Sequence, residues 1–188
     1  MIRHTVARSQ TRFFRFLADT FFAKRYGHRA IVLETIAAVP GMVGGMLTHL
    51  KSLRRLQQGN GTKIHELLEE AENERKHLMF FIEIAQPSML ERIIIIVAQF
   101  IFWHYYLFMY LVSPRTAHLM VAYFEEEAVR SYTDYLEELD KGTLKNVPAP
   151  KSAIEYYNLS EVATLREMIH CVREDERRHM NANKKYAE

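Results

Sequence analysis

Residues 72–78 read ENERKHL, in which Glu74 precedes His77 by three positions. Residues three apart on an α-helix are neighbours on its surface, so this spacing points a carboxylate and an imidazole at one patch. Glu74 also lies inside an apolar stripe that repeats at alternating steps of three and four, namely Ile64, Leu67, Ala71, Glu74, Leu78 and Phe81. The stretch therefore predicts a helix whose buried face carries Glu74, with His77 adjoining it.

Three further glutamates lie on predicted buried helix faces. In the FEEEA run at 124–128, only Glu125 continues an apolar stripe, which runs His118, Ala122, Glu125, Val129, Tyr132, Leu136, Leu139. Near the carboxyl end, Glu176 and His179 continue the line of Leu165, Ile169 and Val172. Glu34 follows Ile31 and precedes Ala38 in a fourth helix. Four helices are thus expected to place a glutamate on a core face, and two of them add a histidine.

The Glu-x-x-His spacing occurs three times in the chain, so spacing alone is weak evidence for a site. The third pair, Glu167 and His170, precedes Glu176 and His179 by nine residues on the same predicted helix. Nine residues are about two and a half turns, so the two pairs face opposite ways. We expect Glu176 and His179 in the core and the other pair at a lateral or surface position.

Burying four carboxylates among apolar side chains without compensation would be prohibitive. For any one of them alone, a surface or ion-paired glutamate is the usual explanation. Two cations would compensate all four directly, and Glu, Glu-x-x-His, Glu, Glu-x-x-His is the ligand pattern of ferritin-like di-iron carboxylate bundles. The pattern therefore predicts an all-α, ferritin-like four-helix bundle with a dinuclear metal centre.

Composition agrees with this fold class. The chain has 188 residues, of which 48% are hydrophobic and 26% charged, and it is expected to form one domain over 1–188. Its net charge of +2 gives no indication of nucleic-acid binding. The single cysteine, Cys171, excludes an internal disulfide and any cysteine-based metal site. Few Gly and Pro interrupt the chain, which favours helices.

Helices are expected at about 11–26, 29–57, 62–85, 115–139 and 160–182, with a long connection at 140–158. Pro40 should kink the second helix, and Gly41, Gly44 and Gly45 should let another helix approach closely. The turn at 59–61 should end that helix. Ser113 and Pro114 are suited to be the cap and first residue of a new helix.

Two segments indicate a membrane surface. Residues 11–26 form a basic amphipathic helix, for which a surface helix on a soluble core is the alternative. Residues 93–112 are an uncharged run long enough to span a bilayer. The helices on either side of that run must share one metal core, which a single crossing would prevent. We expect both segments to form one apolar surface in a single leaflet, with Gln99 and His104 facing the protein.

The chain resembles the mitochondrial alternative oxidases, which are cyanide-insensitive ubiquinol oxidases. Five segments carry the resemblance in order along nearly the whole chain: RYGHRAIVLETIAAVPGMVGGML (25–47), EEAENERKHLMFF (69–81), FEEEAVRSYT (124–133), LDKGTLKNVPAP (139–150) and REDERRHMN (173–181). The resemblance implies a ubiquinol:oxygen oxidoreductase that reduces O2 to water with four electrons and pumps no protons. A soluble ferritin-like di-iron enzyme or iron-storage protein is the alternative, and a metal-free helical membrane scaffold is another.

The resemblance also implies roles for particular residues. Two iron ions would be held, with Glu74 and Glu176 as bridges, by Glu34, Glu74, His77, Glu125, Glu176 and His179. Tyr132 would be a redox-active tyrosine near the metals. Asn73, His118 and Asp175 would hydrogen-bond and orient the ligands. The quinol pocket would involve Arg15, Asp19, Arg29, Leu33, Glu127, Ala128 and Ser131, although Arg15 and Asp19 also fit a plain i,i+4 ion pair.

Three positions depart from the family's usual residues: Ser131 replaces a common threonine, Tyr157 a tryptophan and Lys76 a methionine. The resemblance further implies a homodimer on one leaflet at the matrix face of the mitochondrial inner membrane, with ubiquinol and O2 as substrates. A bacterial cytoplasmic membrane is the alternative location.

Overall fold

The computed structural model describes residues 2–22, 26–56 and 58–188, leaving aside the side chains of 17–22. These residues contain seven helices. Their bounds are α1 (Ile2–Phe22), α2 (Tyr26–Arg55), α3 (Gly61–Ala85), α4 (Met89–Val112), α5 (Pro114–Asp140), α6 (Lys151–Tyr157) and α7 (Leu165–Ala187). The described residues contain no strand beyond an isolated bridge between Pro148 and Thr164. The expected all-α class is confirmed.

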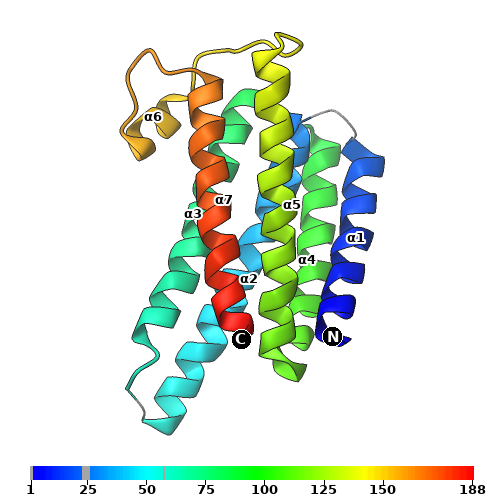
Figure 1. Cartoon of the computed structure of the whole chain (residues 1–188), viewed down its shortest axis with the longest axis vertical. Coiled ribbons are helices and arrows are strands. Elements are labelled where there is room, and N and C mark those ends of the chain that lie inside the picture. Colours follow the sequence, from blue (N-terminus) through cyan, green and yellow to red (C-terminus); the bar gives the residue numbers. More distant parts are fainter. Residues whose placement is uncertain (1, 23–25, 57) are drawn as a thin grey trace.

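The long helices run side by side (Figure 1). α2 packs mainly on α3, and α5 packs mainly on α7, so that two helix pairs build the four-helix core. α4 packs on α2 and α5, while α1 packs on α5. α1 and α4 meet through Phe14, whose ring centroid lies 5.5 Å from that of Phe102 and 5.7 Å from that of Tyr105. The two helices therefore lie together on one side of the bundle.

Close contact between α2 and α3 depends on glycine. A Cβ atom added at Gly41 would lie 2.4 Å from the Leu67 carbonyl oxygen, and one at Gly45 would lie 2.8 Å from Leu68 Cδ2. The expected close helix approach is confirmed at these positions. Pro40 lies inside α2, and the chain is helical on both sides of it.

The helix ends follow local capping chemistry. The Ser113 side chain accepts a hydrogen bond from the Thr116 amide and Pro114 is the first residue of α5, as expected. α7 begins at Leu165, not at 160, because Thr164 and Glu167 form a capping box there. α1 begins at Ile2, not at 11, because Ala7 is buried along with Thr11 and extends the packing face.

The connection expected at 140–158 contains a helix that the sequence analysis missed. α6 covers Lys151–Tyr157, begins after Pro150 and buries Ala153 completely. Its contacts are with α3 and α7, on which it packs. α6 thus covers one end of α3 and α7, which together carry most of the candidate ligands.

Two helices, α2 and α4, are long and apolar enough to cross a membrane, but they differ in burial. The apolar window of α2 is 61% buried, as in a core helix, whereas that of α4 is 17% buried. α4 turns Phe102, Tyr106 and Tyr110 toward the bundle at steps of four. Most of its remaining large apolar side chains are exposed.

The two polar residues of α4 have different positions. Gln99 faces the bundle as expected, and its Nε2 donates to the Thr35 carbonyl oxygen over 3.0 Å. The expectation for His104 was wrong: it is exposed, and its Nδ1 lies 2.8 Å from the carbonyl oxygen of Phe100 on its own helix. His104 comes two residues after Phe102, which places it about 200° around the helix from the packing face.

Candidate metal centre

Four helices bring six buried side chains to one place in the bundle core. Each of the six side chains is at most 7% exposed. The six are Glu34 from α2, Glu74 and His77 from α3, Glu125 from α5, and Glu176 and His179 from α7. Their oxygen and nitrogen atoms form two groups, each with atoms within 4.8 Å of one another. One group holds Glu34 and His77 and the other holds Glu125 and His179, while both contain Glu74 and Glu176.

The facing atoms approach closely without forming hydrogen bonds. His179 Nδ1 lies 2.7 Å from Glu74 Oε1, and His77 Nδ1 lies 3.1 Å from Glu176 Oε1 and 3.3 Å from Glu34 Oε2. Within the described part of the chain, all of these atoms are buried and lack a partner with hydrogen-bond geometry. Several ligand-type atoms therefore point at common centres and not at one another.

This arrangement fits two metal ions. A metal–oxygen distance of about 2.1 Å in octahedral coordination puts neighbouring ligand atoms about 3 Å apart and opposite ones about 4.2 Å apart. The separations of 2.7 to 3.8 Å between histidine and glutamate atoms agree with those values. Carboxylates with imidazoles on four helices suit iron or manganese pairs. Glu74 and Glu176 are the two residues common to both groups.

The pKa values of the six groups are shifted because four carboxylic acids lie close together in one apolar site. Burial and the charges of Glu74 and Glu176 raise the pKa of Glu34 well above its ordinary value, and the same causes raise the pKa of Glu125. Burial also opposes ionisation of Glu74, but the close approach of the His179 and His77 imidazoles outweighs it and lowers the Glu74 pKa. Without a cation, these two glutamates therefore keep their protons to a higher pH than exposed glutamates do.

Both histidines take up protons under the same conditions. Burial lowers the pKa of His77, but its contacts with Asp175, Glu176, Glu34 and Glu74 raise it well above the ordinary value. The pKa of His179 is raised in the same way by Glu176 and Glu74. Four protons, on two glutamates and two imidazoles, therefore provide the charge compensation that two divalent cations would provide in the loaded site.

A hydrogen-bond network surrounds His77 on its outer side. Its Nε2 lies 3.2 Å from Asp175 Oδ2 and 3.0 Å from the Tyr157 hydroxyl. Asn73 Nδ2 donates to the same Asp175 oxygen over 3.0 Å, and the Tyr157 hydroxyl donates to it over 2.7 Å. Donation from Nε2 to Asp175 leaves Nδ1 of His77 free to face the centre. Asn73 and Asp175 thus adjoin a candidate ligand, and Tyr157 is an additional member that the sequence analysis did not assign.

A second buried polar layer lies one helical turn away from the centre. Asn183 Nδ2 lies 2.9 and 3.1 Å from the two carboxylate oxygens of Glu70 and 3.0 Å from the His179 carbonyl oxygen. Asn183 Oδ1 lies 2.8 Å from His118 Nδ1. His118 therefore reaches the candidate ligands through Asn183. Burial raises the pKa of Glu70 to about 7 and lowers that of His118 to about 4.

Glu70 and Asn183 were not predicted from the sequence, although their positions one helical turn from a candidate ligand indicate a place on the same helix face. Glu70 precedes Glu74 by one helical turn, and Asn183 follows His179 by one turn. Each is therefore on the same face as a candidate ligand. In the structure, Glu70–Asn183, Glu74–His179 and His77–Glu176 form successive cross-links between antiparallel α3 and α7. This series sets the register of the two helices.

Tyr132 lies against the candidate centre. Its hydroxyl donates a hydrogen bond to Glu34 Oε1, and its ring stacks on Phe81 with centroids 5.9 Å apart. Burial and the neighbouring Glu34 raise the pKa of Tyr132 well above its ordinary value. The phenol therefore keeps its proton and holds it toward a candidate ligand.

Four of the seven residues implied for quinol binding gather at one pocket. Arg15, Arg29, Glu127 and Ser131 line a cavity of about 60 Å³ together with Tyr26, Arg130 and Asp134. Arg15 from α1 forms an ion pair with Glu127 from α5 at its edge. Leu33 and Ala128 are half-buried and are not among the residues that line it. The side chain of Asp19 lies outside the described residues.

The extra Glu-x-x-His pair is at the surface, as expected. Both Glu167 and His170 are exposed. Glu167 Oε2 accepts a hydrogen bond of 2.6 Å from the Thr164 amide, which caps α7. The pair therefore has a local structural role for its glutamate and does not approach the six buried side chains.

Comparison with known proteins gives consistent matches. A family model described as "Alternative oxidase" matches residues 1–188. "Ubiquinol oxidase 1a, mitochondrial" of Arabidopsis thaliana is 56% identical over 169 residues, which are 90% of this chain and 48% of that protein. "Ubiquinol oxidase, mitochondrial" of Batrachochytrium dendrobatidis is 52% identical over 177 residues, or 94% of this chain and 56% of that protein. The chain spans about half the length of these relatives.

The two glutamates of α7 provide a matched test of the site. Glu176→Gln removes a carboxylate common to both atom groups, so we expect it to weaken metal binding at least about 100-fold, beyond the usual effect of an outer-layer change. Glu167→Gln, on the opposite side of the same helix, should retain metal. Metal content and titration of the metal-free protein with Fe²⁺ or Co²⁺ measure both. Equal metal loss in both variants would contradict the assignment.

Stability of the metal-free protein should fall as the pH rises. Four groups have raised pKa values in the folded protein, namely Glu34, Glu125, His77 and His179. Each of them stabilises the fold fully at a pH below its ordinary pKa, and this stabilisation is lost as the pH rises through the raised pKa. The lowered pKa of Glu74 gives stability that is lost only in acid. The loss should begin above about pH 4.5 for the two glutamates and above about pH 6.5 for the two histidines, and each titrating group should cost up to about 1.4 kcal/mol per pH unit.

Chemical denaturation across that pH range, with and without bound metal, measures this effect. Metal replaces the protons, so the loaded protein should gain stability relative to the metal-free protein as the pH rises. Parallel pH profiles for the two forms would contradict the proton compensation described above.

Proposed function

The chain belongs to the alternative oxidase family, and from this we propose that it is a ubiquinol oxidase that reduces O2 to water at a di-iron centre. The observation that carries the proposal is the pair of overlapping atom groups that have Glu74 and Glu176 in common. We assign Glu34 and His77 to one iron, Glu125 and His179 to the other, and the two common glutamates to both. A bound iron pair would supply O2 binding and electron storage.

The proposed reaction balances without proton pumping. Two ubiquinols release four electrons and four protons as they become ubiquinone, and one O2 consumes the same number to give two water molecules. The protein must then hold the iron pair away from bulk water and let quinol and O2 approach it. The complete burial of Glu74 and His77 supports such an enclosed site.

Tyr132 is proposed as a redox-active residue in this reaction. Its hydroxyl proton already points at Glu34, so loss of an electron from the ring and of the proton to that carboxylate can occur together. Stacking on Phe81 holds the ring in position. Asp175 and Asn73 are proposed to orient His77, and His118 to act through Asn183.

Quinol is proposed to bind at the cavity between α1, α2 and α5. Arg29 or Glu127 would bond a quinol oxygen, next to Arg15 and Ser131. The cavity of about 60 Å³ has room for about two water molecules, not for a quinol ring. Binding there therefore requires the Arg15–Glu127 ion pair to separate. Leu33, Ala128 and Asp19 belong to this proposal by family resemblance alone.

The apolar surfaces of α1 and α4 support attachment to one leaflet of a membrane. Phe13 and Phe16 of α1 and much of α4 are exposed apolar residues. α3 and α5, which precede and follow α4, both contribute to the metal centre, so α4 cannot cross a bilayer without separating them. We propose that α4 lies in the plane of the leaflet.

Location and assembly are also proposals. The relatives are named mitochondrial, which supports a mitochondrial location. We propose the matrix face of the inner membrane, with a bacterial cytoplasmic membrane as the alternative. We propose a homodimer as well. Exposed apolar side chains of α2 offer a surface for it, namely Met42, Met46, Leu50 and Leu53.

Oxygen uptake by the purified chain, with added ubiquinol and with or without cyanide, tests the proposed activity. We expect uptake that needs ubiquinol, persists in cyanide and accompanies about two irons per chain. Iron binding without quinol-dependent uptake would instead favour the soluble di-iron or iron-storage alternative. Absence of iron would favour a metal-free scaffold.

Tyr132→Phe separates the proposed redox role from packing. The phenol is not among the grouped ligand atoms, so the variant should keep its iron and its thermal stability within about 1 kcal/mol. Loss of the hydroxyl should remove most oxidase activity, by about 100-fold or more. Phe81→Leu, which keeps the Tyr132 hydroxyl but changes the packing around its ring, is the control. Full activity in Tyr132→Phe would show that the tyrosine serves packing alone.

A further inference from the structure

α1 has three distinct faces. One face packs on the bundle through Ala7, Thr11 and Phe14. A second face is apolar and exposed, with Ile2 at 81%, Phe13 at 57% and Phe16 at 66% exposure. At about 100° per residue, His4, Arg8 and Arg12 fall on a third face between these two. The imidazole of His4 and the guanidinium groups of Arg8 and Arg12 therefore follow one edge of the exposed apolar surface.

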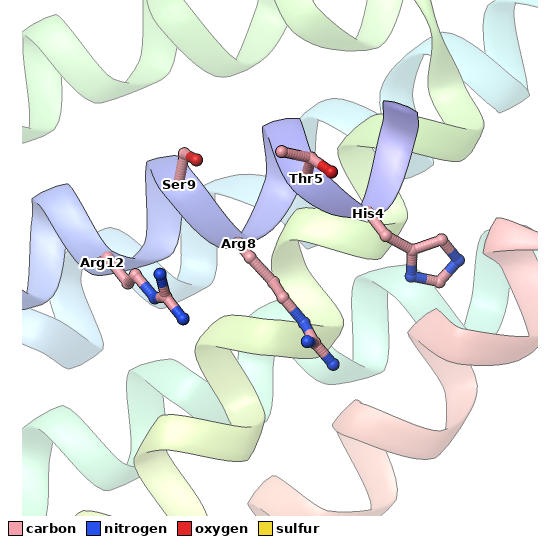
Figure 2. A pocket seen from close by; sticks show the side chains of 5 residues that line it. All are labelled: His4, Thr5, Arg8, Ser9 and Arg12. Carbon is pink, nitrogen blue, oxygen red and sulfur yellow. The ribbon is translucent and has the colours of Figure 1, made fainter. Parts of the chain in front are cut away.

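His4, Arg8 and Arg12 belong to a depression on the surface of α1 whose lining contains no carboxylate. His4, Thr5, Arg8, Ser9 and Arg12 line a volume of about 430 Å³, and Figure 2 shows all five on successive turns of α1. His4, Arg8 and Arg12 are spaced four positions apart, so the row extends over about 12 Å. Arg8 and Arg12 are both exposed along this row.

Within the described part of the chain, no acid compensates the two arginines of this row. Arg8 lies over the Tyr123 ring at 5.1 Å, and His4 Nδ1 lies 2.8 Å from the Tyr123 hydroxyl. Among the described residues, no carboxylate forms an ion pair with Arg8 or Arg12. Arg15, one turn further along, differs because it is paired with Glu127. The row thus retains positive charge that an external anion can neutralise.

We propose that His4, Arg8 and Arg12 bind the phosphate groups of anionic phospholipids in the leaflet that takes up the apolar faces of α1 and α4. Guanidinium groups bind phosphate oxygens through two parallel hydrogen bonds, which favours phosphate over other anions. With Phe13 and Phe16 among the acyl chains, the adjoining cationic face lies at the depth of the headgroups. The hydroxyl group of Ser9 adds a donor beside the arginines.

Two other sources of phosphate fit less well. A nucleic acid would call for an extensive basic surface, whereas the chain has a net charge of only +2 and apolar residues flank the row. Free phosphate would not use the adjoining apolar face. The inference rests on the membrane attachment proposed above and adds a headgroup class and a site to it.

Flotation of the full chain with vesicles tests the proposal. Vesicles of phosphatidylcholine alone measure attachment through the apolar faces, and vesicles that also contain phosphatidylglycerol measure the anionic contribution. The double variant Arg8→Gln/Arg12→Gln should bind the anionic vesicles about 30-fold more weakly, since each arginine near such a surface contributes about fivefold. Its binding to phosphatidylcholine should not change.

The charge-matched control is Arg54→Gln/Arg55→Gln, which removes two exposed arginines at the end of α2. This variant should keep the preference for anionic vesicles. Equal loss in both double variants would mean diffuse attraction and would overturn the site. Inorganic phosphate at constant ionic strength should not release the protein; release would show that the row takes free phosphate and would also overturn the proposal.

The two underlying proposals fail in different ways. If the unmodified chain does not bind phosphatidylcholine vesicles at all, attachment through α1 and α4 is wrong. If it binds neutral and anionic vesicles equally well, attachment stands and the headgroup site is wrong. Equal binding of the unmodified chain to a single-stranded oligonucleotide and to anionic vesicles would assign the row to nucleic acid instead.

Discussion

Four glutamates in one apolar core are the constraint on which the rest of this structure depends. Charged carboxylates at that depth are stable only when positive charge or protons compensate them. Two imidazoles are close enough to take part, and the shared position of Glu74 and Glu176 between two atom groups suits a pair of cations. The helices that provide these groups must therefore hold a fixed register, because a shift by one residue would rotate a ligand away from the centre.

The structure maintains that register with polar contacts beyond the centre itself. Glu70 and Asn183 connect α3 and α7 one turn from the candidate ligands, and Asp175 with Asn73 connects the same helices on the other side of His77. The absence of a side chain at Gly41 lets α2 approach α3 closely. Glu34 reaches the centre from α2 as a result. Close helix packing and buried hydrogen bonds thus act together to position the six candidate ligands.

The outer helices separate the metal chemistry from the surroundings. α4 covers α2 and α5 with Phe102, Tyr106 and Tyr110, and it presents its other apolar residues outward. α1 adds an apolar face, a cationic row and Arg15, which reaches Glu127 beside the small cavity. One helix therefore connects the proposed membrane surface with the proposed entrance for quinol.

The sequence by itself determined the helical class and the six candidate ligands, because a buried helix face repeats at three and four residues and Glu74, Glu125 and Glu176 interrupt apolar stripes. The same local rule assigned Glu167 and His170 to the surface. Only the tertiary structure decided the partners of Glu70, Asn183 and Tyr157, because their bonds join residues that are between 18 and 113 positions apart. It also decided that His104 faces outward and that α6 lies within the long connection. Periodicity reports which side of a helix is buried, but the neighbour on that side depends on how the helices pack.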